Sequence, residues 1–180
     1  MEKIRSNVKA GIIILLAIAC ATLAVLWPQW QKELQAQYYT LEVPIDIKPG
    51  SCPNPLNVNA MGNLSVALLG TRSFDVTKVD PETVRLEGIA PTRWAIEDVA
   101  TPYFPYIGKQ DAYDCWTYGA DRYKDLVFKF NVLDLVVGAL GNVNDGDVLL
   151  LQLTGNLKEN FGGDPFVGED VIIIKSKNKK

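Results

Sequence analysis

Residues 125 to 155 read DLVFKFNVLDLVVGALGNVNDGDVLLLQLTG, and this stretch decides the class of fold that the sequence predicts. In DLVFKF, apolar residues alternate with others and Lys129 falls on the outward side, which is typical of a half-buried strand. VLLLQL is almost continuously apolar and predicts a central strand that is buried on both faces. Between these strands the only candidate helix is Leu133 to Leu140, which is no longer than one or two turns.

The same period of two recurs along most of the chain after residue 40. Turn signals separate the runs at 61–63, 79–81, 144–146 and 162–165. Short strands with frequent turns and little helix predict an all-β fold, a single β-sandwich of the Ig-like or jelly-roll type. The predicted strands are Leu41–Ile47, Leu64–Leu69, Val84–Glu87, Asp125–Val132, Val148–Thr154 and Val171–Lys175.

A different kind of segment comes before this domain. Lys3, Arg5 and Lys9 precede an apolar run from Ala10 to Trp27 that contains no charged residue. As a helix the run would span ~27 Å, close to the thickness of the hydrocarbon core of a bilayer. Basic residues before such a run keep the N-terminus in the cytoplasm and send the remainder across.

The sequence therefore predicts an exported, membrane-anchored protein with four parts. Residues 1–27 form a signal anchor or transmembrane helix, 28–40 a stalk, 41–176 the extracytoplasmic β-sandwich and 177–180 a basic tail. Two alternatives stay open for the first part, a cleaved signal peptide and a lipoprotein signal with Cys20 as the modified residue. All three readings export the rest of the chain.

Export changes the meaning of the cysteines. Of the three in the chain, Cys20 lies in the apolar run, so Cys52 and Cys115 remain outside the membrane. Two cysteines in an oxidising compartment predict a disulfide, with two free thiols or an intermolecular bridge as the alternatives. Closing a loop of about 60 residues would stabilise the fold by ~4 kcal/mol on the chain-entropy estimate.

Several motifs resemble a domain of exported bacterial proteins. They are IDIKPGSCPNPLNV, LSVALLGTRSFDVTKVDPETVRLEG, DLVFKF and NDGDVLLLQLTG, which together cover roughly residues 45–175. The pattern of that family is a DIKPGS-PN opening, a VAILGT-FDVT-IDP-SVR middle, an Asp/Asn/Gly-rich stretch that ends in DLV, and a closing LTG strand. The resemblance implies an exported β-sandwich that often stands beside other surface modules, and it implies no particular activity.

In the resembled family, the stretch before DLV often reads like a calcium loop. Aligned on DLV, Asp121 and Asp125 fall on ligand positions of that loop, whereas Thr117, Gly119 and Arg122 depart from it. Calcium takes six to eight oxygen ligands, so Asp111, Asp114, Asp98 or backbone carbonyls would have to supply the others. The resemblance thus implies a Ca²⁺ site formed by Asp111, Asp114, Asp121 and Asp125, and the alternative is an acidic turn without metal.

The same region is rich in aromatic residues, and we call residues 101–123 the aromatic-acidic loop. Rings beside acidic groups can stack on sugars, which makes Tyr106, Tyr113, Trp116 and Tyr118 candidate ligand-binding residues. Aromatic residues in a long loop also commonly fold back as a cover over a sandwich. Both interpretations stay open at this stage.

The amino-acid composition excludes several classes of function. The chain has no histidine, which removes the commonest general base and every His-based metal site. With 18 basic and 21 acidic residues it lacks the basic excess that nucleic-acid binding needs. We expect no enzyme activity, but a surface, assembly or adhesion module with protein partners or self-assembly. The alternative is a carbohydrate- or cell-wall-binding module that uses the aromatic-acidic loop.

Overall fold

The computed structural model describes residues 40–176. The predicted anchor helix at 1–27, all but the last residue of the predicted stalk, and the basic tail at 177–180 lie outside the described residues. Within residues 40–176, no helix is long and apolar enough to cross a membrane.

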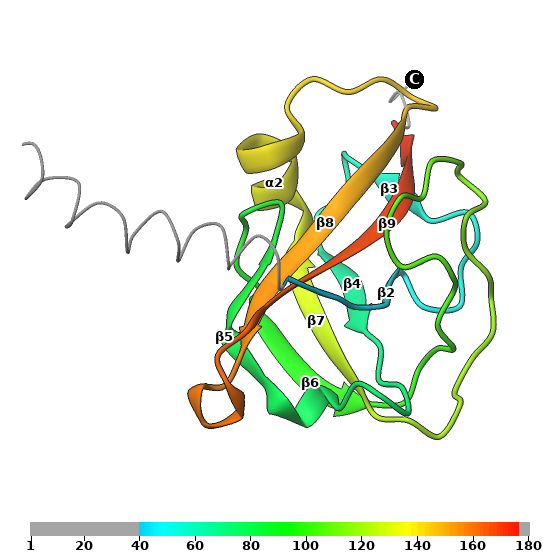
Figure 1. Ribbon diagram of the computed structural model, residues 1–180. Helices are drawn as coiled ribbons and strands as arrows, with labels where there is room; N and C mark the ends of the chain where they lie inside the picture. Colours follow the sequence, from blue (N-terminus) through cyan, green and yellow to red (C-terminus); the bar gives the residue numbers. More distant parts are fainter. Residues whose placement is uncertain (1–39, 177–180) are drawn as a thin grey trace, which may run out of the picture. The chain divides into compact units, whose positions relative to one another are not determined.

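The described chain is mostly β-sheet, with 41% strand in two sheets and one short helix (Figure 1). The first sheet has the order β1-β9-β8-β5, with β3 also paired to β9, and the second has the order β2-β4-β7-β6. The strands of the first sheet are β1 (Leu41–Glu42), β3 (Pro55–Asn57), β5 (Val79–Leu86), β8 (Val148–Leu157) and β9 (Pro165–Lys175). Those of the second are β2 (Ile45–Ile47), β4 (Asn63–Leu68), β6 (Arg93–Glu97) and β7 (Asp125–Asn131).

The two sheets enclose one hydrophobic core. Val66 and Phe128 of the second sheet belong to the same buried cluster as Leu151, Leu153 and Phe166 of the first. Because alternate residues of a strand point to opposite faces, the period of two in the sequence places these side chains inward. The arrangement is compatible with the predicted β-sandwich.

The helical prediction is confirmed between β7 and β8. α2 (Val132–Leu135) continues into one π-helical turn, η2 (Val136–Leu140). The Asn131 side chain accepts hydrogen bonds from the N–H groups of Leu133 and Asp134, which caps the start of α2. Two single 3₁₀ turns complete the elements, η1 (Val76–Lys78) and η3 (Glu159–Phe161).

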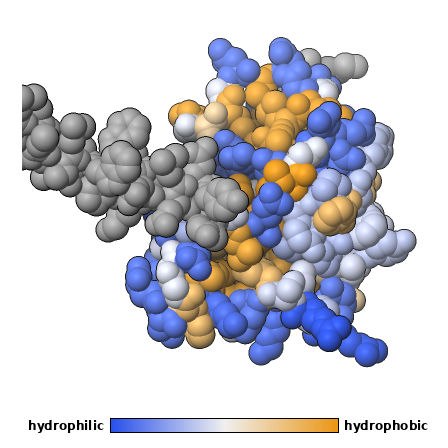
Figure 2. Space-filling model, in the orientation of Figure 1, coloured by the Kyte–Doolittle hydropathy of each residue, from blue (hydrophilic) through white to orange (hydrophobic). Residues whose placement is uncertain are grey.

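Strand β8 corrects one prediction, because it is central but not buried on both faces. Val148 and Leu150 are 43% and 40% exposed, whereas Leu151 and Leu153 are buried. Figure 2 shows hydrophobic residues at the surface over β8 and beside α2. A continuous apolar run therefore does not distinguish a covered outer face from an exposed one.

Two further predictions were wrong in detail. The turn expected at 79–81 lies inside β5, where Pro81 occupies an edge strand, a position that tolerates a missing N–H group. Strands β3 and β6 were not predicted at all, because three to five residues without a clear alternation give too little signal.

The first three strands of the domain alternate between the two sheets. β1 runs parallel to the start of β9, β2 joins the second sheet, and β3 returns to the end of β9. Between β1 and β3, the edge of β9 is therefore left without a strand partner within the described residues. The aromatic-acidic loop lies against this gap.

Candidate functional site

A disulfide attaches the aromatic-acidic loop to the turn before β3. Cys52 and Cys115 are bonded, with their Cα atoms 5.6 Å apart. This confirms the pairing predicted from the sequence. A disulfide fits an oxidising, extracytoplasmic environment.

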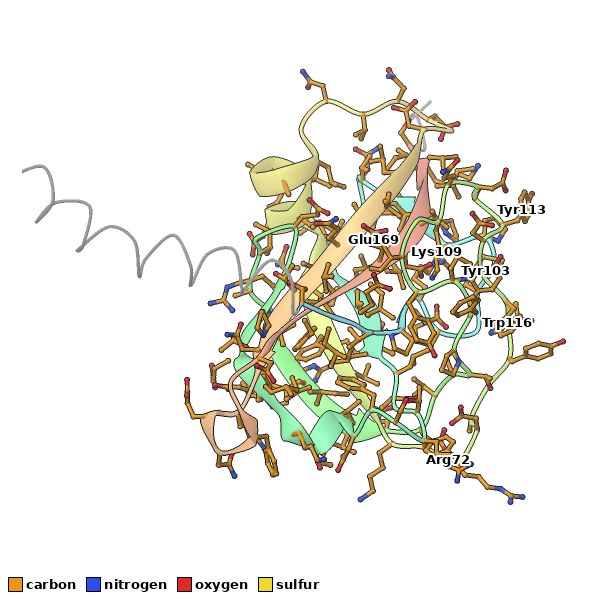
Figure 3. The ribbon with its side chains drawn as sticks, in the orientation of Figure 1. Arg72, Tyr103, Lys109, Tyr113, Trp116 and Glu169 are labelled. Carbon is orange, nitrogen blue, oxygen red and sulfur yellow. A yellow bond between two sulfur atoms is a disulfide. The ribbon has the colours of Figure 1, made fainter. Side chains whose placement is uncertain are left out.

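Three contacts fasten the loop to the open edge of β9. The N–H group of Gly108 donates to Glu169 Oε2 at 2.8 Å, and the N–H group of Glu169 donates to the Tyr106 carbonyl at 3.4 Å. Lys109 Nζ donates to Asp170 Oδ1 at 2.8 Å. Figure 3 shows Lys109 and Glu169 close together, with Tyr103 and Trp116 farther out on the loop. The backbone of residues 106–108 and the side chain of Lys109 thus occupy the place that a strand would otherwise take.

Lys109 and Asp170 form a buried ion pair, the one ion pair recorded among residues 40–176. Their side chains are 2% and 1% exposed. The second carboxylate oxygen of Asp170, Oδ2, accepts from the N–H group of Ile47 at 2.7 Å and from Asn54 Nδ2 at 3.1 Å. Both oxygens of Asp170 are therefore held by donors in a site without solvent.

Asp46 is the third titratable group at this place. It lines the same small space as Lys109 and Asp170, and its Oδ1 has no hydrogen-bond partner within the described structure. Burial, together with the negative charge of Asp170, raises the pKa of Asp46 to about 8. Asp46 is therefore mainly protonated at neutral pH. We call Asp46, Asn54, Lys109 and Asp170 the buried cluster.

Aromatic rings of the loop cover the buried cluster. Lys109 Nζ lies 5.4 Å from the centroid of the Tyr103 ring, a cation–π distance. Tyr103 in turn packs edge-on against Trp116, with ring centroids 5.2 Å apart. The loop aromatics thus exclude water from the ion pair, which strengthens its electrostatics.

The structure separates the four predicted calcium ligands into different local roles. Asp111 and Asp114 share one turn, where Asp114 Oδ2 accepts from the N–H groups of Gln110 and Asp111, both at 2.8 Å. These bonds lower the pKa of Asp114. Asp121 Oδ1 accepts from the N–H group of Tyr123 at 2.9 Å.

Asp125 is fully buried at the start of β7. Its Oδ1 accepts from the N–H group of Gly70 at 3.0 Å, and its Oδ2 accepts from those of Val99 and Ala100 at 2.8 and 3.2 Å. Burial raises the pKa of Asp125, and these bonds oppose the shift. Asp125 thus joins the start of β7 to two other backbone segments, at Gly70 and at residues 99–100.

Within residues 40–176, no three acidic or cysteine side chains converge in a way that could hold a metal ion. Calcium binding stays a prediction, which melting curves recorded with calcium and with chelator can test.

The predicted ligand-binding aromatics do not form a common plane. Trp116 Nε1 donates to the Thr101 carbonyl at 2.8 Å, and its ring is inclined by 57° to that of Tyr118. Tyr106 packs against Phe104 at 73°. Tyr113 is 69% exposed and has no recorded ring partner among the described residues. Three of the four rings therefore pack within the loop itself.

A second feature of interest is the edge strand β6, whose sequence is RWAIE. All five of its residues are exposed, with Trp94 at 39% and Ile96 at 52%. Within the described structure β6 pairs with β7 alone, so its other side is open (Figure 1). Arg93 and Glu97 form no ion pair with any described residue.

Neither the buried cluster nor β6 was predicted from the sequence. A signal for the cluster was present, because Asp46 and Asp170 each stand inside an otherwise apolar strand, in IDI and EDVIII. Buried acids are rare unless they are paired, so such positions point to a partner.

No family model, curated protein or solved structure matches the chain. The resemblance of its motifs to a domain of exported bacterial proteins therefore stays a prediction.

Proposed function

We propose that this chain is a non-catalytic assembly module, an Ig-like or jelly-roll-type β-sandwich that a membrane helix at residues 1–27 holds outside the cytoplasm. Its contact surface is the open edge of β6. The single observation that carries the proposal is an exposed strand edge with two large apolar side chains, Trp94 and Ile96. Such edges accept a strand from another chain, because their N–H and C=O groups are already aligned.

β5, an edge strand of the first sheet, shows what a protected edge looks like. β5 carries Pro81, and its pairing register shifts between Asp80 and Arg85. Proline and bulges are devices that prevent strand addition. Among the described residues β6 has neither a proline nor a register shift, so its open edge favours association.

The partner that best fits β6 is a second copy of β6. Antiparallel pairing centred on Ala95 places Arg93 of each copy opposite Glu97 of the other. The same register places Trp94 opposite Ile96 on the other face. Opposite charges and aromatic–aliphatic pairs across strands each contribute roughly 0.2–1 kcal/mol. A two-fold axis forms every pair twice, and the second sheet then continues across both copies.

A charge exchange tests this pairing. We expect Arg93→Glu and Glu97→Arg each to weaken dimerisation of the full-length protein by ~10-fold, because like charges then meet at both ends of the strand pair. The double variant restores opposite charges and should return the dissociation constant to near the wild-type value. Sedimentation equilibrium in detergent measures all four proteins. Glu82→Arg on β5 is the matched control and should leave association unchanged.

Two results would reject the proposal. The first is a wild-type protein that stays monomeric at all concentrations measured. The second is a double variant that associates no better than the single ones, since a merely structural effect of each substitution would add rather than cancel.

The carbohydrate-binding alternative has weaker support. A sugar-stacking platform needs rings that lie side by side in one orientation, and the loop rings are mutually inclined. The bonds of Trp116 and Asp114 within the loop favour a covering role instead.

A further inference from the structure

The buried cluster has the composition and geometry of a site for amide formation. An amine and a carboxylate, Lys109 Nζ and Asp170 Oδ1, lie 2.8 Å apart in a place that solvent does not reach. The other oxygen of that carboxylate is held by two N–H donors, from Ile47 and Asn54. Asp46, which has an unpartnered oxygen, lines the same space. None of these groups takes part in the proposed contact surface.

We propose that Lys109 and Asp170 condense into an intramolecular isopeptide bond, with Asp46 carrying the protons. The Lys109 nitrogen forms a bond to Asp170 Cγ, and the bond from Cγ to Oδ1 breaks. Oδ1 leaves as water with two of the three protons of the Lys109 ammonium group. The third proton stays on the amide nitrogen, so an ion pair becomes a neutral amide plus one water and no other reactant is needed.

The electrophile is already polarised by its surroundings. As nitrogen attacks, negative charge develops on Asp170 Oδ2, which becomes the amide oxygen. The N–H group of Ile47 and Nδ2 of Asn54 donate to this oxygen at 2.7 and 3.1 Å. Preorganised donors aimed at a developing oxyanion are the arrangement that lowers the barrier of acyl transfer.

Asp46 supplies the proton transfers that the reaction needs. A lysine ammonium is no nucleophile until it loses a proton, and the departing oxygen must gain protons. The first proton passes directly from Lys109 Nζ to Asp170 Oδ1, which already accepts its hydrogen bond. A carboxyl group that is kept neutral by burial can then donate the second proton to the departing oxygen and receive one from nitrogen. Asp46 thereby returns to its starting state.

Burial also supplies the driving force. Holding an amine against a carboxyl group gives effective concentrations of roughly 10⁵–10⁸ M in well-oriented cases. A buried ion pair carries a desolvation cost for each ion, which a neutral amide does not carry. Both effects favour condensation over the ion pair. The product would link the loop covalently to β9, in addition to the disulfide that links it to the turn before β3.

Mass spectrometry tests the bond directly on the full-length protein after reduction and denaturation. The expected mass is lower than that of the sequence by one water. Digestion should leave the backbone uncut after Lys109, because trypsin does not recognise an acylated lysine. It should also yield one branched peptide that joins the segment of Lys109 to that of Asp170.

The peptide linkage decides the result, because cyclisation at Asp145-Gly146 would remove the same mass without joining two segments. Asp46→Asn preserves the shape of the side chain and should abolish the branched peptide. Glu169→Gln, the neighbouring acid on β9, should retain it. A wild-type protein of full mass, with the Lys109 and Asp170 segments recovered separately, would overturn the proposal whatever the variants do. Strand β6 contains none of the groups that form this bond. The dimerisation tests on β6 can therefore fail or succeed independently of the test for the isopeptide bond.

Discussion

Replacing Asp125 by alanine should destabilise the fold more than any other change to an acidic residue of the loop region. The carboxylate is fully buried and accepts three backbone N–H bonds, from Gly70, Val99 and Ala100. Alanine removes all three acceptors and leaves buried donors without partners. Each unsatisfied donor costs roughly 1–3 kcal/mol. After allowing for relaxation, we expect a loss of ~3–5 kcal/mol in the free energy of unfolding.

Asp125→Asn refines the estimate. Its single carbonyl oxygen can keep the two bonds from Val99 and Ala100, while its amide group then faces the N–H group of Gly70. The loss should therefore be smaller, about 1–2 kcal/mol. Asp121→Ala is the matched control, since Asp121 accepts one backbone bond near the surface. A change within about 0.5 kcal/mol is expected there.

Denaturant unfolding of the full-length variants measures these differences in the free energy of unfolding. They follow from the shift of the transition midpoint when the slope of free energy against denaturant concentration is unchanged. A loss below about 1 kcal/mol for Asp125→Ala, comparable with Asp121→Ala, would refute the reasoning, since buried donors would then have found other partners.

Melting curves in millimolar calcium and in chelator test the calcium prediction. An ion that binds only the folded state raises the melting temperature, and Asp125→Ala should abolish that gain. Coincident curves for the wild type would refute calcium binding.

Three further predictions concern other parts of the fold. Cys52→Ser with Cys115→Ser should lower the free energy of unfolding by ~4 kcal/mol, because the bond closes a separation of 63 residues; unchanged denaturation of the double variant would contradict this. Gly70→Ala should cost about 1–3 kcal/mol, since a methyl group there would collide with the carbonyl oxygen of Lys124, and a fully stable variant would show that the backbone can yield. The raised pKa of Asp46 means that the folded state keeps a proton that the unfolded chain loses, so the free energy of unfolding should fall as pH rises from about 4 to about 8. Asp46→Asn should flatten that slope, and an identical slope in the variant would assign the pH dependence to another group.

Local sequence pattern alone could predict those elements in which the order of apolar and polar residues shows which side chains face the core. In β7, alternation from Asp125 to Asn131 identifies both the strand and its inward face, because neighbouring side chains must point to opposite sides. The short helix after it follows from the change of period. A disulfide between Cys52 and Cys115 could be predicted because the expected export places both in an oxidising compartment, while the third cysteine lies in the apolar run.

Long-range geometry decided the rest. Asp125 has the same chemistry in a calcium loop and in a buried backbone clamp, and only the approach of Gly70 and Val99 distinguishes them. Position in the sheet made β6 an open edge, a property that depends on the strand order and not on RWAIE itself. The buried cluster forms because Asp46, Lys109 and Asp170 meet where β9 lacks a strand partner. Along the chain, each of the three residues is more than sixty positions from the next. Charge and hydrogen-bonding capacity belong to single residues and can be read in a sequence. Distance and burial belong to the folded chain, and these two quantities turn an acid on a strand into a group that can react.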